Sequence, residues 1–266
     1  MTAMTVRRRC LKATASLALV CTAGAVGLLA AAPAALAAPS VVVVSSSSYG
    51  PQSDGFLYIV GETKNTGAGP ITGISVTIGL YNSANVLLTT DDVASQVSVL
   101  APGEKGGFLD IVTPPAGYAS YKVLGVSAAD AAAAGYHRFA VTNVHDVPDS
   151  AGVHDITGTV TNAGYYSAQN VRLFFTFYNQ AGTVVDVDSQ LLPAGTLNIA
   201  ASGTFDEHNI PASIHYTSFA LVVEGAVNAP PCGPCVPFTR IAGPTRIETS
   251  VAASLDQFPA AGSASA

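Results

Sequence analysis

Three groups of residues could carry chemistry: a cysteine pair, several histidine–acid pairs and pairs of aspartates. Cys232 and Cys235 form a C-x-x-C motif that lies between prolines. A reactive thiol pair needs a helix N-terminus to lower the thiol pKa, and no second pair nearby offers the four ligands of a zinc site. We expect a local disulfide in an exported chain, with free thiols or an intermolecular bridge as the alternatives.

The histidine–acid pairs would serve metal binding or acid–base catalysis. They are His145-Asp146, His154-Asp155 and Asp206-Glu207-His208. Their spacings match no helical H-x-x-x-H pair, and the chain has neither a G-x-S-x-G nor an H-E-x-x-H motif. We therefore interpret these histidines as residues of surface loops, and we predict no catalytic residue, no metal and no cofactor.

The aspartate pairs could in principle bind a calcium ion. Asp186 and Asp188 fall on one face of an expected strand, and Asp91 and Asp92 stand at the matching place earlier in the chain. Calcium requires six to eight oxygen ligands, and these carboxylates are too few to supply them. We interpret them as solvated acids.

Composition excludes several classes of protein. The 266 residues are 49% hydrophobic and 11% charged, which is too apolar for an intrinsically disordered chain. Four of the 11 basic residues lie in the first 12 positions. Removal of residues 1–37 leaves 7 basic and 17 acidic residues, a net charge of −10. A nucleic-acid partner is excluded, because such proteins carry a basic footprint.

The first 37 residues are typical of a signal peptide. A basic segment, residues 6–12, precedes an apolar stretch over residues 13–32, and Ala35 and Ala37 supply the small residues of a cleavage site. Arg7-Arg8-Arg9 also resembles a twin-arginine signal, with the general secretory route as the alternative. We predict a secreted or wall-associated protein with no transmembrane anchor in the mature chain, since no later segment is long and apolar enough to span.

The rest of the chain contains an internal repeat at an offset of 97 residues. At least thirteen identities share this register without a gap. The first copy supplies Pro51, Ser53, Gly55, Asn65, Gly67, Tyr81, Asn82, Ala84, Asp91, Leu100, Gly106, Phe108 and Pro114. We therefore predict tandem domains over residues 38–129 and 137–226, joined by a linker over residues 130–136.

Each copy reads as a β domain. Hydrophobic residues alternate with small or polar ones along residues 74–80 and again along residues 171–177, as in a strand with one buried face. Asn65-Thr66-Gly67 and Asn162-Ala163-Gly164 mark turns. The prediction is an all-β chain of two tandem immunoglobulin-like β-sandwiches, each with six or seven strands. Strands are expected near residues 41–47, 56–64, 73–81, 86–93, 105–112 and 119–127, and 97 positions later.

Two aromatic residues of the second copy form a candidate contact patch. Phe174 and Tyr178 lie on the strand face opposite Leu173, Phe175 and Phe177. The patch would either pack against the first copy or bind an outside ligand.

The repeat resembles the FxLYD-type domain of exported bacterial proteins. The resemblance rests on residues 61–67, residues 76–82 and Leu100-Ala101-Pro102-Gly103-Glu104. Asn82 and Asn179 stand where that family often has Asp. The resemblance implies a spacer or binding role and supplies no catalytic residues.

The C-terminal segment follows a Pro-rich linker over residues 227–237. Residues 239–250, T-R-I-A-G-P-T-R-I-E-T-S, resemble the opening of a type 2 cell-wall-binding repeat, written R-I-x-G-x-x-R-x-E-T. Arg240, Gly243 and Arg246 are the candidate wall-contacting residues that this resemblance implies. Ile247 stands where that family often has Tyr. The segment 238–266 is expected to be an incomplete repeat, and the match ends inside its first copy.

Local signals in this segment predict a strand, a turn and a helix. Thr245 and Glu248 have the spacing of a capping box, and Ile247, Val251 and Leu255 recur at helical spacing. We therefore expect a short incomplete α/β tail, with a helix that begins near Thr245.

Together these features predict a non-enzymatic surface protein of a Gram-positive actinobacterium. The sandwiches would form a stalk or display module, and the C-terminal region would bind a cell-wall polymer. Two alternatives remain open: the front part of an amidase-like wall hydrolase whose catalytic domain is missing, and a freely secreted ligand-binding protein.

Overall fold

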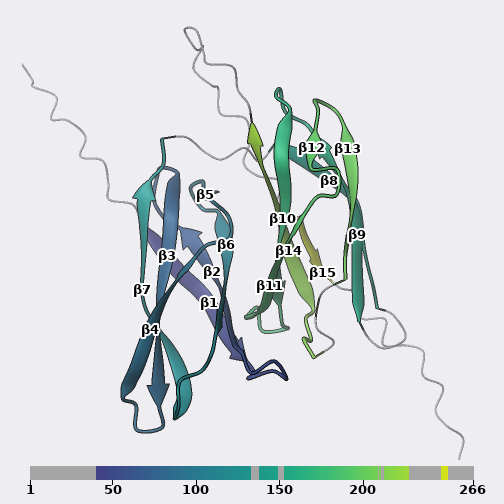
Figure 1. Ribbon diagram of the computed structural model, residues 1–266. Helices are drawn as coiled ribbons and strands as arrows, with labels where there is room; N and C mark the ends of the chain where they lie inside the picture. The colour runs from purple at the N-terminus through teal and green to yellow at the C-terminus, as the bar shows by residue number, and fades with distance from the viewer. Residues whose placement is uncertain are drawn as a thin grey trace, which may run out of the picture. The chain divides into compact units, whose positions relative to one another are not determined.

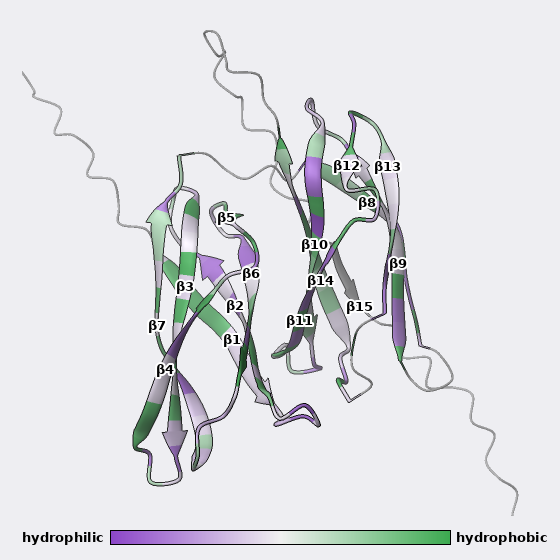
Figure 2. Cartoon of the chain, viewed as in Figure 1, coloured by the Kyte–Doolittle hydropathy of each residue, from purple (hydrophilic) through white to green (hydrophobic). Residues whose placement is uncertain are grey.

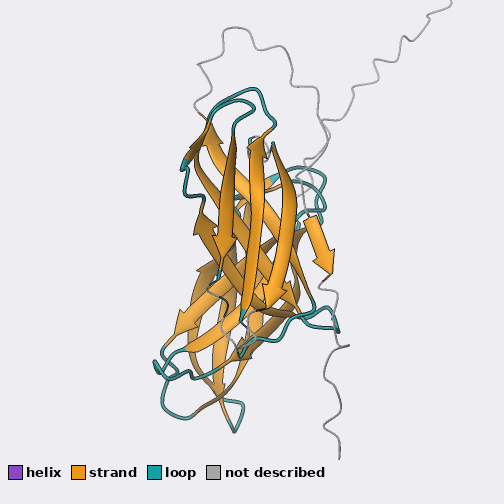
Figure 3. Cartoon of the chain, turned by 90° about the vertical axis from the view of Figure 1, so that its right-hand side faces the viewer, coloured by secondary structure: helices purple, strands orange, loops and turns teal. Residues whose placement is uncertain are grey.

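The computed structural model describes residues 40–132, 138–148, 153–208, 210, 213–227 and 247–250. All of them belong to one compact unit, Ala37–Ala266. Strands and loops account for this described part of the chain, and it contains no helix (Figure 3). No helix long and apolar enough to cross a membrane is found among these residues.

The first repeat forms a β-sandwich of two antiparallel sheets (Figure 1). One sheet has the order β1-β2-β6, with β1 at Val41–Tyr49, β2 at Leu57–Asn65 and β6 at Lys105–Val112. In the other sheet β3 (Ile71–Asn82) is central. It pairs with β4 (Leu87–Ala94), β5 (Val99–Leu100) and β7 (Tyr118–Asp130).

The second repeat forms the same arrangement. One sheet has the order β13-β9-β8, with β8 at Phe139–Pro148, β9 at His154–Asn162 and β13 at Ser202–Glu207. In the other sheet β10 (Ala168–Tyr178) is central. It pairs with β11 (Val184–Leu191), β12 (Thr196–Leu197) and β14 (Ser218–Val227).

The prediction of an all-β fold with tandem sandwiches is confirmed. Each repeat has seven strands, and the bounds of β2, β4 and β5 recur 97 residues later in β9, β11 and β12. Both central strands also carry a register shift at the same place, between Thr72 and Ser75 in β3 and between Gln169 and Arg172 in β10.

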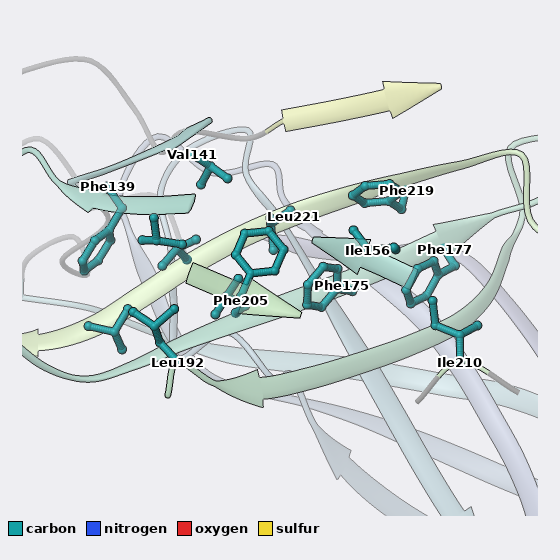
Figure 4. Packing of buried hydrophobic residues seen from close by; sticks show 14 of the residues in the cluster. Phe139, Val141, Ile156, Phe175, Phe177, Leu192, Phe205, Ile210, Phe219 and Leu221 are labelled. Atoms are coloured by element: carbon teal, nitrogen blue, oxygen red, sulfur yellow. The ribbon is translucent and has the colours of Figure 1, made fainter. Parts of the chain in front are cut away.

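The core of each sandwich lies between its sheets, because alternate side chains of a strand point to the same face. Figure 2 shows the alternation of hydrophobic and hydrophilic residues along the strands. In the second sandwich Phe175, Phe177, Phe205 and Phe219 pack around one another with ring centroids 6.0–6.3 Å apart (Figure 4).

A glycine on the neighbouring strand makes room for a phenylalanine ring in both repeats. Gly61 of β2 pairs with Phe108 of β6, and a Cβ at Gly61 would lie 2.3 Å from the Phe108 ring. Gly158 and Phe205 repeat the arrangement at 2.5 Å. Both distances are shorter than any real carbon contact, so each ring requires glycine as its neighbour.

The turn after β2 is fixed by a buried asparagine. The Nδ2 of Asn65 donates to the carbonyl oxygens of Gly69 and Leu100, and its Oδ1 accepts from the Gly67 amide. Asn162 makes the matching three bonds in the second repeat. Each asparagine is 0% exposed, so its side-chain amide needs these backbone partners in place of water.

The prediction of a helix that begins near Thr245 is wrong for Ile247–Ser250, the residues of this segment that the structure describes. Ile247–Ser250 form a strand, β15, which pairs antiparallel with β14 from Ser218 to Leu221. The capping-box pattern is a local signal worth about 1 kcal/mol. The unpaired edge of β14 offers a row of backbone hydrogen bonds, and these outweigh the local preference.

Candidate functional site: the contact between the two sandwiches

Phe174 and Tyr178 lie on β10, on the face opposite the core of the second sandwich. They are 7% and 8% exposed. Phe174 packs in a cluster with four residues of the first sandwich: Ile71, Ile74, Val97 and Leu100. The proposed contact patch is thus covered by the first repeat.

A second apolar cluster surrounds Tyr178. It contains Val60 from β2 together with Val184, Val187 and Ala220 from the second sandwich. The backbone of β6 also comes close, because a Cβ at Gly107 would lie 2.7 Å from Cγ1 of Val187. The β1-β2-β6 sheet of the first sandwich therefore packs against the β10 and β11 strands of the second.

A buried charged group lies inside this contact. Glu62 is 2% exposed, and its Oε1 accepts a 2.5 Å hydrogen bond from the Tyr178 hydroxyl. Its Oε2 lies 2.7 Å from Nζ of Lys105, which is itself 5.8 Å from the centre of the Tyr178 ring. A carboxylate removed from water needs such partners, because an unpaired buried charge costs several kcal/mol.

Serine side chains of β1 satisfy the backbone of the edge strand β11. The Val184 amide donates to Oγ of Ser45 at 3.0 Å, and Oγ of Ser47 donates to the Val184 carbonyl at 2.6 Å. The hydroxyl of Tyr49 donates to Oδ1 of Asp186 at 2.9 Å. These bonds continue the pairing of β11 into the neighbouring sandwich.

The interpretation of Asp186 as a solvated acid is wrong, because Asp186 is buried and only 4% exposed. Burial raises the pKa of this carboxyl to about 6, with a smaller contribution from the charge of Asp188, while bonds from Tyr49 and the Val187 amide oppose the rise. Burial also raises the pKa of Asp188. Asp91 and Asp92 are exposed, as expected, and Asp92 accepts a bond from Thr77.

The histidines singled out from the sequence lie on or beside strands. His145 and His154 belong to β8 and β9, so their assignment to loops is wrong. Nδ1 of His154 lies 2.7 Å from Oδ1 of Asp146, whose Oδ2 accepts a 3.0 Å bond from Tyr216. The Tyr216 ring packs 4.8 Å from Phe177, so this group closes the end of the second core.

Two of the histidine–acid pairs meet in a cluster that their spacing in the chain did not predict. Asp155, Asp206 and His208 bring one ligand atom each to within 4.8 Å of one another. Asp155 and Asp206 are 51 residues apart in the chain, so no local motif joins them. The sheet pairing of β9 with β13 brings them together.

A groove opens where the sandwiches meet. Its volume is about 640 Å³, and it is lined by Gln96 and Ser98 from the first sandwich and by Arg172, Phe174 and Glu224 from the second. The Ser98 amide donates to Oε2 of Glu224 at 3.0 Å. Nη1 of Arg172 on β10 donates to Oγ of Ser189 on the neighbouring strand β11 at 3.3 Å, and both residues line the groove.

Several predicted residues lie outside the described part of the chain. They are the signal segment 1–37, the cysteines Cys232 and Cys235, and the candidate wall-contacting residues Arg240, Gly243 and Arg246. Most of the two expected linkers, 130–136 and 227–237, also lies there.

The comparisons with known proteins place the chain in no family. No family model and no curated protein matches the chain. Among solved structures, a red sea bream transglutaminase is 11% identical over 73% of this chain, with a TM-score of 0.22. The chain spans 30% of the length of that protein. At this TM-score the likeness supports no statement about the fold or the activity of the present chain.

Proposed function

We propose that this chain is an exported, non-enzymatic surface protein whose paired sandwiches act as a spacer or display module, and whose C-terminal region binds a cell-wall polymer. The closed contact between the sandwiches is the observation that carries this proposal. A spacer must hold its ends in a defined orientation, whereas domains joined within one chain move freely unless their interface is large and well packed.

The chemistry of the contact supports a fixed orientation. Apolar clusters around Phe174 and Tyr178 give it cohesion. The Glu62 carboxylate fixes the relative position of the two sandwiches, because a sliding movement would separate this buried charge from the Tyr178 hydroxyl of the second sandwich. Such a movement would cost more than the loss of apolar contact alone.

The negative net charge of the protein opposes non-specific binding to a cell wall. The chain without residues 1–37 has a net charge of −10, so anionic wall polymers would repel it in bulk. Attachment then has to come from a specific segment. The resemblance of residues 239–250 to a cell-wall-binding repeat supplies one, with Arg240 and Arg246 as its cations.

The groove between the sandwiches favours a second candidate, a secreted ligand-binding protein. Arg172 at its edge follows a register shift in β10, and such bulges re-aim side chains. Asn170 in the bulge has a φ of 50°, and the equivalent residue of the first repeat, Gly73, also has a positive φ, 59°. The second repeat thus places Asn170 and Arg172 where the first has Gly73 and Ser75.

Sedimentation with purified Gram-positive cell walls tests the first candidate. Residues 38–266 should pellet with the walls, and a variant with Arg240→Ala and Arg246→Ala should stay in solution. A variant with Arg138→Ala and Arg172→Ala matches the loss of charge and should pellet like the parent. A parent chain that stays in solution would overturn wall binding. Release of amines or reducing sugars from the walls would overturn the non-enzymatic assignment.

A further inference from the structure

The outer face of the β13-β9-β8 sheet brings two carboxylates and an imidazole to one place. Asp206 of β13 lies beside Thr157 of β9, and Glu207 lies beside Ile156. Continuing this antiparallel register places position 208 opposite Asp155. Ile156 and Glu207 are buried in the sandwich, so Asp155, Asp206 and His208 project from the opposite, exposed face.

The spacing of these ligand atoms is close to that of a metal site. All three lie within 4.8 Å of one another, and Nδ1 of His208 is 3.7 Å from Oδ1 of Asp206. Ligands bound to a tetrahedral zinc ion at about 2.1 Å are about 3.4 Å apart. Small side-chain rotations would therefore close the site, while the two strands hold the backbone in place.

The charges at this place favour a cation. Among the described residues the ion pair of Asp206 is with His208, and neither aspartate forms a salt bridge with Lys or Arg. Two carboxylates this close repel each other, and a divalent ion would remove that repulsion. Imidazole together with carboxylate suits zinc and other first-row transition metals, whereas calcium takes oxygen ligands alone.

The first repeat shows that the fold does not require these residues. Its counterparts of Asp155, Asp206 and His208 are Tyr58, Leu109 and Ile111. The second repeat thus has three metal-ligating side chains at one corner of a sheet where the first repeat has three apolar or aromatic residues. A further residue that can bind metal, His145, lies on the same face. It pairs with Thr157 of β9, and Thr157 pairs with Asp206 of β13 on its other side.

We propose that Asp155, Asp206 and His208 form a binding site for a divalent transition-metal ion of the zinc type. Three protein ligands leave a fourth position of the tetrahedron for water or for a group from outside. His145 lies two strands from Asp206, about 10 Å away, so it is placed to approach the site rather than to complete it as it stands. The site is independent of wall binding and goes beyond the proposed function.

Titration with Zn²⁺ by calorimetry, and with Co²⁺ by visible absorption, tests the proposal. The protein would be residues 38–266 with Cys232→Ser and Cys235→Ser, because the two thiols could bind zinc by themselves. We expect one ion per chain, and Co²⁺ bands typical of nitrogen and oxygen ligands. Asp206→Asn should weaken binding at least tenfold, and Asp206→Asn with His208→Ala should abolish it.

The matched control is Asp92→Asn, which removes one carboxylate of the exposed pair Asp91 and Asp92 in the first sandwich. It should leave the affinity unchanged. Far-UV circular dichroism would check that each variant folds. Absence of binding by the parent chain, or equal affinity of the parent and the Asp206→Asn, His208→Ala variant, would overturn the site.

Discussion

The hydroxyl of Tyr178, on β10 of the second sandwich, donates a 2.5 Å hydrogen bond to Glu62, on β2 of the first. The two residues are 116 positions apart, and each is less than 10% exposed. The first repeat has the same tyrosine, Tyr81, but there the ring lies 4.5 Å from Nζ of Lys122 and is only partly buried. One repeated residue thus has two different roles.

Tyr178→Phe should destabilise the protein by about 1–3 kcal/mol, because it removes a hydrogen bond from a buried carboxylate and leaves the packing intact. The urea midpoint of unfolding measures the change. Tyr81→Phe is the control, and it should shift the midpoint by less than about 0.5 kcal/mol. Equal effects of the two substitutions would show that the bond to Glu62 contributes nothing specific.

Phe174→Ala should loosen the contact between the sandwiches. The substitution removes a ring that packs on Ile71 and Leu100 and should cost about 3 kcal/mol. Small-angle X-ray scattering should then show a larger radius of gyration than in the parent. Ile199→Ala, at a position 57% exposed, is the control and should change neither quantity. A scattering profile identical to that of the parent would argue against an interdomain role for Phe174.

The stability of the protein should fall as the pH rises from about 4 to about 6. The pKa of Asp186 is raised to about 6, chiefly by burial, from an ordinary value of 3.8. The pKa of Asp110 is raised to about 6 by burial and by the charge of Asp91. Between the two values the folded state holds protons that the unfolded state releases, so ionisation above this range costs stability.

Asp186→Asn should therefore stabilise the protein at pH 7.5 by roughly 1–3 kcal/mol and change little at pH 3.5. The amide oxygen still accepts the bonds of Tyr49 and the Val187 amide. Urea unfolding at both pH values measures the effect, and the exposed Asp92→Asn is the control. A variant less stable than the parent at pH 7.5 would show that the charged form of Asp186 is required.

Asn65→Ala and Asn162→Ala should destabilise the protein by similar amounts, about 2–4 kcal/mol each. Each substitution leaves one buried carbonyl group, one partly buried carbonyl group and an amide without the side-chain partner described above. Thermal unfolding followed by circular dichroism measures the loss. Asn179→Ala, in an exposed turn, is the comparison and should cost less than half as much. A small effect at Asn65 or Asn162 would mean that water replaces the amide.

The strands were predictable because their signals are local and occur twice. Alternation along β3 and β10 marks a buried face, and an offset of 97 residues aligns the turns at Asn65 and Asn162. The pair Gly61 and Gly158 was also visible as a repeat, although its meaning required the rings of Phe108 and Phe205.

The contacts across the sandwiches were not predictable from such signals. Phe174 and Tyr178 stood out as aromatic residues on an outer face, but their partners Ile71 and Val60 are more than 100 positions away. The burial of Asp186 depends on the same contact, so its sequence neighbours gave no sign of it. In the C-terminal segment the helix signal at Glu248 was overridden by the open edge of β14.

The contact between the repeats joins unlike surfaces. The first sandwich uses its β1-β2-β6 sheet together with residues of β3 and β5 around Phe174, and the second uses β10 and β11, which is a head-to-tail geometry. Such a geometry can continue from one molecule to the next and build fibres, unless one end is blocked. The equivalent β8-β9-β13 face of the second sandwich carries Thr157 and Asp206 in place of Val60 and Leu109.

This exchange removes apolar residues from one of the two surfaces that an end-to-end contact would need. The outer face of the first sandwich can therefore keep exposed Leu87 and Leu124 without recruiting a second molecule end to end. We therefore expect the divergence between the repeats to disfavour end-to-end association of the chain through this type of contact.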